Sequence, residues 1–287
     1  MKQLIKIVRS AGAHWVGDGF PVQSLFSYDA MGTQMSPFLL LDYAAPTSFP
    51  PSGRRAGVGE HPHRGFETVT IVYQGSLEHR DSGGNHGRIG PGDVQWMTAA
   101  SGVVHEEFHA EEFRRLGGVL EMVQLWVNLP AKHKMSPPRY QEITDARIPS
   151  VVLAGGAGTL RVIAGDFNGT PGPVVTVTPV HIWDLRLNAG TSTPLTLPEG
   201  YTTALVVLKG SLKLSASETA RAAEMALFER AGGGISIECV EDAKALLLCG
   251  EPIDEPIVGR GPFVMNTQRE IEQAMRDYQS GRMGHLT

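Results

Sequence analysis

Short blocks of alternating or uninterrupted hydrophobic residues recur along the 287-residue chain, and glycine, proline, asparagine or aspartate bounds each of them. Blocks of about four to eight residues between such turn residues are typical of β-strands. We expect strands at Leu4–Val8, Met35–Leu41, Thr68–Tyr73, Val94–Met97, Val123–Val127, Thr159–Ala164 and Val174–Thr178. The pattern therefore predicts a mainly β protein.

A helical pattern is confined to the C-terminal end of the chain. Asn266 or Thr267 can cap a helix over Gln268–Gln279, and Gly281 ends it. The apolar residues that share one face of this helix are Ile271, Met275 and Tyr278. We therefore expect the helix to pack on the body of the protein.

The chain length suits two domains, and a break in the hydrophobic pattern marks their boundary. After Pro130 the strand-like pattern lapses through Pro137 and Pro138 and resumes near Val151, so we place the boundary at about residues 130–150. We predict an N-terminal domain over residues 1–135, a C-terminal domain over 146–260, and a final segment, 261–287, that packs back on the body.

A weak internal repeat agrees with two copies of one β module. The hexapeptide Val72–Leu77 is echoed 135 residues later by Val207–Leu212, and each copy runs from a strand into a Gly turn. The same offset places Thr196, Pro198 and Thr202 in the positions of His61, His63 and Glu67. The second copy therefore lacks the polar side chains that distinguish the first.

Composition narrows the classes of function. With 34 glycines, 19 prolines and 19% charged residues, the chain favours short strands and turns over long surface helices. The net charge of −5, with no local basic patch, argues against direct binding to nucleic acid or to an anionic membrane. Cys239 and Cys249 have neither metal-type nor redox-type spacing, so we expect buried reduced thiols and a cytoplasmic location, with no export signal or membrane span.

Histidines gather in the N-terminal half, where six of the ten lie between residues 61 and 109. They are His61, His63, His79, His86, His105 and His109. If the chain is already extended at His61, side chains 61, 63 and 67 project to one face, and on a later strand His105 and Glu107 share a face from which Glu106 is excluded. Two such strands facing inward would bring imidazoles and a carboxylate together.

Neutral imidazoles with one carboxylate suit Fe, Mn, Ni, Cu or Zn, and the absence of thiolates argues against a closed structural zinc site. For the carboxylate ligand, Glu67 competes with Glu107, and its alternative role is to support a ligand or a strand pair. We expect His79, His86 and His109 to lie in loops or behind the ligands. Phe66 and Trp96 are core residues or form an apolar wall for a flat ligand.

Five longer motifs resemble the pirin family: His14–Phe20, His61–Thr68, Gly90–Ala99, Gln124–Pro130 and Gly261–Thr267. They span almost the whole chain, so the resemblance is more specific than an isolated His-x-His pair. It implies two cupin barrels, of the double-stranded β-helix or jelly-roll type, packed face to face, with a short C-terminal helix. It also implies that the metal lies in the N-terminal barrel and that the C-terminal barrel has no metal site.

The family's ligand set of three histidines and one glutamate falls on His61, His63, His105 and Glu107. The carboxylate that often binds metal in other cupins corresponds to Glu67, and Ala100–Gly102 stands where other cupins have Pro-x-Gly, although Gly102 still supplies the turn. The ion that we expect is Fe(II), with Ni, Mn, Cu, Co and Zn as alternatives.

The resemblance implies a metal-dependent quercetin 2,3-dioxygenase, which opens the heterocyclic ring of a flavonol with O2 and for which Glu107 would be the general base. Its partners would be a small aromatic, flavonol-like substrate and O2. The alternative is a non-enzymatic, iron-containing, redox-sensing regulatory protein that acts through protein partners. A third alternative is an enzyme for another dihydroxylated aromatic compound.

Overall fold

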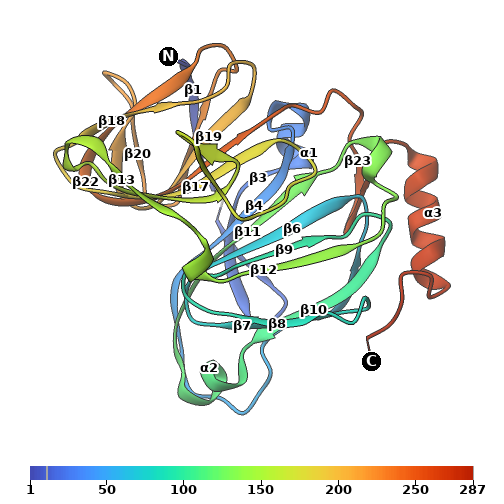
Figure 1. The fold of residues 1–287 in the computed structure, drawn as a ribbon. Helices are drawn as coiled ribbons and strands as arrows, with labels where there is room; N and C mark the ends of the chain where they lie inside the picture. Colours follow the sequence, from blue (N-terminus) through green and yellow to red (C-terminus); the bar gives the residue numbers. More distant parts are fainter. Residues whose placement is uncertain (11, 287) are drawn as a thin grey trace. The chain divides into compact units, whose positions relative to one another are not determined.

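The structure, a computed structural model, describes residues 1–10 and 12–286, and it is mainly β with two cupin domains (Figure 1). The chain divides into two compact units. We call residues 12–33, 38–145 and 253–287 the first barrel, and residues 1–11, 34–37 and 146–252 the second barrel. The chain thus contributes several separate segments to each barrel.

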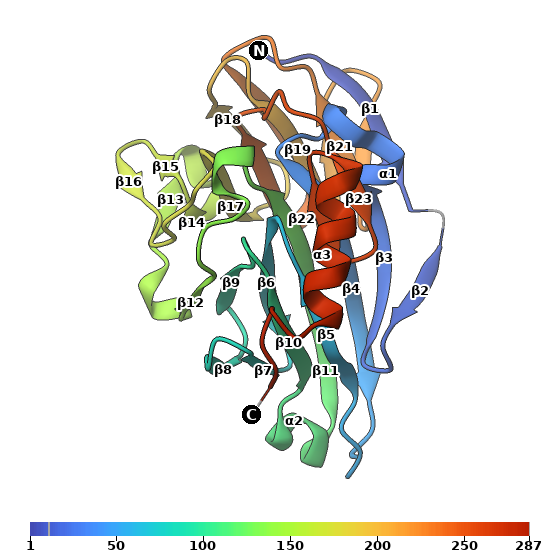
Figure 2. The same cartoon turned by 90° about the vertical axis from the view of Figure 1, so that its right-hand side faces the viewer.

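The first barrel consists of two antiparallel sheets. Its strands are β2 (Ala13–Val16), β3 (Phe20–Ser27), β4 (Phe38–Phe49), β5 (Gly57–His63), β6 (Phe66–Gln74), β7 (Leu77–Asp81), β8 (His86–Ile89), β9 (Val94–Thr98), β10 (Val103–His109), β11 (Gly118–Asn128) and β12 (Arg139–Ile143). The larger sheet has the order β12-β9-β6-β11-β4-β3-β2, and the smaller has the order β5-β10-β7-β8. Figures 1 and 2 show β7, β8 and β10 facing β6 and β9 across the barrel.

The side chains inside the first barrel are apolar at one end and polar further along the strands. At one end, apolar residues of the two sheets form a buried cluster with the helix α2 (Glu111–Leu116). The members of this cluster are Phe20, Val22, Ala44, Val72, Leu77, Ile89, Ala110, Phe113, Leu120 and Met122. Since each fully buried large apolar side chain stabilises the fold by about 1.5 to 3 kcal/mol, this end holds the two sheets together. The polar side chains follow further along the same strands.

The second barrel is built on one nine-stranded sheet. Its strands are β1 (Leu4–Arg9), β13 (Ser150–Leu153), β14 (Gly158–Ala164), β17 (Val180–Leu187), β18 (Ser192–Thr196), β19 (Thr202–Lys213), β20 (Thr219–Arg221), β21 (Glu224–Phe228) and β22 (Gly234–Gly250), with a separate pair formed by β15 (Asp166–Phe167) and β16 (Thr170–Pro171). The sheet order is β1-β21-β19-β22-β17-β14-β13, with β18 paired to β22 and β20 to β19. Leucine, valine and isoleucine side chains fill its interior together with the buried free thiols of Cys239 and Cys249.

Short helical segments complete the structure: α1 (Tyr28–Met31), η1 (Gly32–Gln34), η2 (Ala131–His133), η3 (Asp145–Arg147) and η4 (Ala154–Gly156). The C-terminal segment returns to the first barrel as β23 (Val258–Arg260), β24 (Phe263–Met265) and α3 (Gln268–Gln279) (Figure 2). Ile271 and Ala274 of α3 pack with Val104 of β10 in a buried cluster. The helix therefore lies behind the strand that carries His105.

A buried ion pair fixes α3 to the barrel. Arg64 Nη1 donates to Asp277 Oδ2 at 2.7 Å, and Arg64 Nε donates to the Ser101 carbonyl oxygen at 2.6 Å. The side chains of Arg64 and Asp277 are only 5% and 11% exposed. Burial by itself raises the pKa of the Asp277 carboxyl, but the hydrogen bonds from Arg64 and Gln273 outweigh it, and the pKa lies below its usual value.

A second buried cation, Lys134, ties the return segment to the loop after the His61 strand. Its ammonium donates to the carbonyl oxygens of Gly65 at 2.7 Å and Val264 at 2.9 Å and to Asn128 Oδ1 at 2.7 Å. The whole residue is 1% exposed. Burial lowers the pKa of Lys134 to about 7.

The predicted elements can be compared with these bounds. Strands occupy the predicted blocks, except that the block at Met35–Leu41 begins only at Phe38 and that Val174–Thr178 is not a strand. The latter prediction is wrong because Pro173 and Pro179 enclose the block, and proline cannot donate to a strand ladder. Strand β1, predicted as part of the N-terminal domain, pairs with β21 in the second barrel.

The helix prediction is confirmed over Gln268–Gln279, with Thr267 as the cap that accepts from the Glu270 backbone N–H. Its buried face differs from the predicted one, because Ile271, Ala274 and Asp277 are buried and Met275 is partly buried, whereas Tyr278 is 39% exposed. The repeat prediction also has a structural counterpart. Gly75 and Gly210 both adopt the left-handed backbone region, with φ of 82° and 78°, which favours glycine at this turn.

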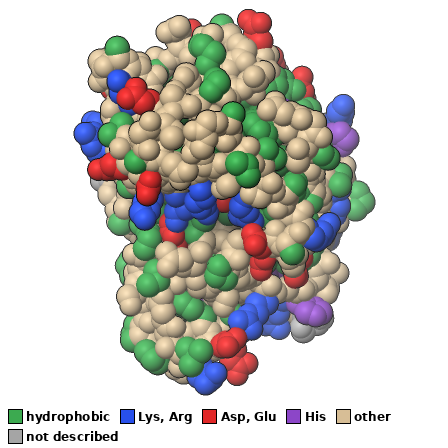
Figure 3. Space-filling model, turned by 60° about the vertical axis from the view of Figure 1, so that its left-hand side comes forward, with side chains coloured by type: hydrophobic (Ala, Val, Ile, Leu, Met, Phe, Trp, Pro, Cys, Tyr) green, Lys and Arg blue, Asp and Glu red, His purple; other side chains and the backbone are tan. Residues whose placement is uncertain are grey.

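No helix among the described residues is long and apolar enough to span a bilayer. Figure 3 shows one face of the molecule, on which Lys and Arg side chains stand close to Asp and Glu side chains and hydrophobic side chains are scattered between them.

We expect Asp277→Asn to lower the free energy of unfolding of the first barrel by about 3 kcal/mol, because the loss of one partner leaves the buried Arg64 charge uncompensated. Denaturant titration measures this change. The matched control is Glu272→Gln, on the exposed face of the same helix, which should change stability by less than about 0.5 kcal/mol. Equal effects of the two variants would contradict the structural role of the ion pair.

Lys134 gives stability a distinct pH dependence. Between pH 7 and 10 the unfolded chain keeps a proton on this lysine, whose unfolded pKa is about 10.4, whereas the folded protein loses it at about 7, so this contribution to stability rises with pH. The difference between wild type and Lys134→Met should therefore grow by about 3 kcal/mol from pH 7 to pH 10, at about 1.4 kcal/mol per pKa unit. Parallel denaturant titrations across this range would show a constant difference if the prediction is wrong.

Candidate metal centre

Two neighbouring strands of the smaller sheet present the predicted cluster. Strand β5 carries His61 and His63, and strand β10 carries His105 and Glu107. The strands are antiparallel, and their register places His61 directly opposite His105. Since successive side chains of a strand alternate between faces, Glu106 points out of the barrel, where it pairs with two arginines. The structure thus brings the four predicted residues together.

The three imidazoles surround one point. Their candidate ligand nitrogens all lie within 4.8 Å of one another. The ring centroids of His61, His63 and His105 are 4.3 to 4.9 Å apart. Glu107 lines the same cavity as His61 and His63.

The Nδ1 atoms of His61 and His63 face main-chain carbonyl oxygens, which leaves Nε2 as the candidate metal-binding nitrogen of each ring. The His61 Nδ1 lies 2.8 Å from the Gly59 carbonyl oxygen, and the His63 Nδ1 lies 3.4 Å from the Pro262 carbonyl oxygen. A carbonyl oxygen only accepts, so Nδ1 carries the proton in both rings and Nε2 keeps its lone pair. The Nε2 atom of His105 is buried and has no hydrogen-bond partner among the described residues.

The protonation of the rings also suits a metal. Burial, followed by the neighbouring imidazoles, lowers the pKa of His63 and of His105 well below the usual value, so both rings are neutral near pH 7. Neutral imidazole is the form that binds metal ions. A buried lone pair without a donor, beside two further imidazoles and a carboxylate, is the arrangement that a divalent transition-metal ion satisfies.

Three side chains from the larger sheet hold the Glu107 carboxylate. Thr70 Oγ1 and Gln95 Nε2 donate to its Oε1, each at 3.2 Å, and Gln124 Nε2 donates to its Oε2 at 3.1 Å. These donors come from β6, β9 and β11, so the carboxylate is oriented from across the barrel. Sequence analysis missed them. Gln124 and Trp126 are two residues apart on β11, so they share its inward face. This spacing is the sequence signal that could have identified Gln124.

A cavity of about 220 Å³ opens beside the cluster. Its wall is mainly apolar, and it is lined by Val16, Phe20, Val22, Leu40, Asp42, Val58, His61, His63, Glu107, Met122, Gln124, Trp126 and Pro262. Phe20 and Trp126 are aromatic residues of this wall. The two aromatic side chains named from the sequence lie elsewhere, because Phe66 stacks behind Trp126 at 4.3 Å between ring centroids and Trp96 lies on the other face of β9 from Gln95.

The structure does not place Glu67 in the cluster. The sequence argument assumed one extended strand from His61 to Glu67, but the chain turns at Gly65, whose φ is 91°, and β5 and β6 belong to different sheets. Glu67 therefore projects from the face of β6 opposite to Thr70, where its Oε1 accepts from Thr98 Oγ1 at 2.6 Å. Burial raises the pKa of this carboxyl.

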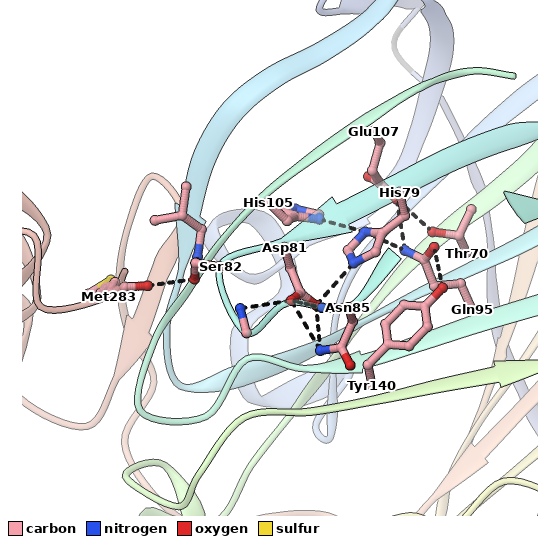
Figure 4. A network of polar contacts seen from close by, with 12 residues as sticks. Thr70, His79, Asp81, Ser82, Asn85, Gln95, His105, Glu107, Tyr140 and Met283 are labelled. Carbon is pink, nitrogen blue, oxygen red and sulfur yellow. Dashed lines mark hydrogen bonds and ion pairs between the residues drawn. The ribbon is translucent and has the colours of Figure 1, made fainter. Parts of the chain in front are cut away.

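The other three histidines of the group have separate environments. His79 on β7 is buried behind His105, with its Nδ1 3.4 Å from the His105 Nδ1 (Figure 4). Ligand atoms of His79, His105 and Glu107 also lie within 4.8 Å of one another. His86 is exposed on β8, and His109 donates from Nε2 to the Gly19 carbonyl oxygen at 2.9 Å among phenylalanine rings.

The fold and these side chains define a bicupin whose first barrel contains a histidine-rich cluster that could hold a metal ion. Residues 19–127 match the Pirin family and residues 182–284 match the Pirin C-terminal cupin domain. A Pseudomonas aeruginosa protein named "Putative quercetin 2,3-dioxygenase" is 58% identical over 282 residues, which cover 98% of each chain. The chain belongs to the pirin family.

Two further comparisons agree with this assignment. Pirin-1 of Arabidopsis thaliana is 41% identical over 234 residues, covering 80% of this chain and 79% of the plant protein. The crystal structure of an Acinetobacter baumannii protein described as quercetin 2,3-dioxygenase superposes with a TM-score of 0.97, at 49% identity and with complete coverage of both chains.

Proposed function

We propose that His61, His63, His105 and Glu107 together bind one divalent transition-metal ion, with Fe(II) as the ion in the cell. The observation that carries this proposal is the buried Nε2 of His105, which faces two other imidazoles and has no protein partner among the described residues. Three neutral nitrogens and one carboxylate oxygen suit iron, and also nickel, manganese, copper, cobalt or zinc.

We further propose that the protein is a dioxygenase that opens the heterocyclic ring of a flavonol such as quercetin. The mainly apolar cavity beside the four ligands supports this, since a flat aromatic molecule can lie against Trp126, Met122 and Leu40 while one of its oxygens reaches the cluster. The names of the Pseudomonas and Acinetobacter relatives support the same reaction.

The residues of the chain suit the first step of this reaction. A bound ion would supply Lewis acidity to a substrate oxygen. The Glu107 carboxylate accepts the proton of the flavonol 3-hydroxyl, and the hydrogen bonds from Thr70, Gln95 and Gln124 keep it at that position. The electron-rich flavonolate then takes up O2, and ring opening releases carbon monoxide. The apolar wall excludes water while this takes place.

Metal content tests the ligand set. We expect Glu107→Gln to weaken binding of Co(II) to the purified protein by at least about tenfold, because it removes the only anionic ligand. Glu67→Gln is the matched control, since it makes the same change at another buried carboxylate. Glu67 projects from the face of β6 that points away from the histidine cluster, so this variant should bind Co(II) like wild type. Competition with a chromophoric chelator measures both affinities. Weakening by Glu67→Gln alone would reverse the assignment.

Turnover tests the reaction. Protein loaded with Fe(II), Mn(II), Ni(II), Cu(II) or Co(II) should consume quercetin and O2 and release one carbon monoxide per quercetin. In the metal-loaded state, Glu107→Gln should lower kcat by about 10² to 10⁴, the usual contribution of a general base. If fully loaded, folded wild-type protein turns over no quercetin with any of these ions, the dioxygenase assignment fails and a regulatory role for the same metal site becomes the better account.

A further inference from the structure

We propose that Asp81 and His79 are positioning residues that select the tautomer of His105, so that its Nε2 presents a lone pair to the metal. This inference rests on the proposed role of His105 as a ligand and is independent of the dioxygenase reaction. The three residues form a chain of hydrogen bonds from β7 to β10 (Figure 4).

The chain starts at Asp81, at the end of β7. Its Oδ1 accepts from the backbone N–H groups of Gly83 at 2.9 Å and Asn85 at 3.0 Å, which fixes the carboxylate in a tight turn. Its Oδ2 lies 3.2 Å from the His79 Nε2. The Asn85 side-chain amide also donates to both carboxylate oxygens, at 3.1 Å to Oδ1 and 3.0 Å to Oδ2, so N–H donors surround the Asp81 carboxylate and it acts as an acceptor toward His79.

The tautomer of His79 follows from this contact. Because Asp81 only accepts, the His79 Nε2 carries the proton that lies between the two side chains. Gln95 shows that His79 Nδ1 is an acceptor. The Gln95 oxygen accepts from the Tyr140 hydroxyl at 3.4 Å, so its amide nitrogen faces His79 Nδ1 at 3.3 Å and donates to it. The single lone pair of His79 Nδ1 is therefore shared between the Gln95 N–H and the neighbouring His105 Nδ1 at 3.4 Å.

The tautomer of His105 follows in turn. Its Nδ1 lies 3.4 Å from the His79 Nδ1, which is an acceptor, so the His105 proton is on Nδ1. The lone pair is then on Nε2, the buried atom that has no partner among the described residues. His61 and His63 reach the same state through main-chain carbonyl oxygens, whereas His105 depends on a side-chain relay.

Packing keeps the relay in one arrangement. His79 and Asp81 are 4% and 5% exposed and His105 is 0% exposed, so water does not compete for these hydrogen bonds. The His79 ring stacks on Tyr140 with 4.8 Å between ring centroids and an angle of 13° between planes, which holds the plane of the ring. Partners of this kind behind a metal ligand are worth about 10-fold to 100-fold in metal affinity.

Asp81→Asn tests the relay with a minimal change of shape. The asparagine oxygen must still accept from the Gly83 and Asn85 backbone, so its amide nitrogen faces His79 and donates to Nε2. The His79 proton then moves to Nδ1, where it opposes the His105 Nδ1–H. We expect His105 to switch to the Nε2–H tautomer and Co(II) affinity to fall about 10-fold to 100-fold.

Asp93→Asn is the matched control. Asp93 also accepts two backbone N–H groups, from Gly90 and Asp145, in a turn of the same barrel, but within the described part of the chain it has no hydrogen bond to Asp81, His79 or His105. It should reproduce any loss of stability from the turn while leaving Co(II) affinity and the His105 tautomer unchanged. His79→Phe, which can keep the stacking on Tyr140 but cannot accept from His105, should weaken Co(II) binding like Asp81→Asn.

The primary readout is long-range ¹H–¹⁵N NMR of the metal-free wild-type protein, which reports the protonated ring nitrogen of each histidine. A proton on Nδ1 of His105 and on Nε2 of His79 supports the relay, and any other assignment overturns it. Equal Co(II) affinity of Asp81→Asn and Asp93→Asn also overturns it. Failure of wild type to bind Co(II) would instead refute the proposed metal site, whereas the tautomers are decided without the metal.

Discussion

The pairing of β5 with β10 is the constraint on which the site depends. Its register sets His61 opposite His105, and the pleat turns His63 and Glu107 to the same side, so two short segments that are about 40 residues apart supply a ring of donors. A slip of one residue would direct Glu106 inward and the imidazole of His105 outward. The buried apolar cluster at the other end of the barrel and the α3 helix behind β10 hold this register.

A polar group inside a barrel is costly to bury without a hydrogen bond, and this cost explains which residues surround the cluster. Thr70, Gln95 and Gln124 serve Glu107, and Asp81 with His79 serves His105. At the centre of the cluster, the buried His105 Nε2 has no hydrogen-bond partner among the described residues, and a cation would complete it. In the second barrel, by contrast, the buried cluster consists of apolar side chains, mainly leucine, valine, isoleucine and alanine.

The return segment links the metal cluster to the end of the chain. Pro262 contributes the carbonyl oxygen that lies beside His63 Nδ1, and Arg64 and Lys134 anchor the same segment through buried hydrogen bonds. Breaking these contacts would therefore disturb His63, a proposed metal ligand, as well as helix α3. This gives a physical reason for the similarity of the Gly261–Thr267 motif to the family, because its backbone takes part in the site.

Much of this was determined by the sequence alone. Period-two alternation located most strands and paired His105 with Glu107, and a capping threonine with a final glycine bounded α3, since these signals are local. Only the tertiary structure separated Glu67 from the histidine cluster, because a turn at Gly65 moves the two halves of that segment into different sheets. The residues that support the cluster through hydrogen bonds, such as Gln124 and Asp81, were likewise found only in the tertiary structure. They lie on strands that meet across the barrel, and no local sequence pattern encodes such contacts.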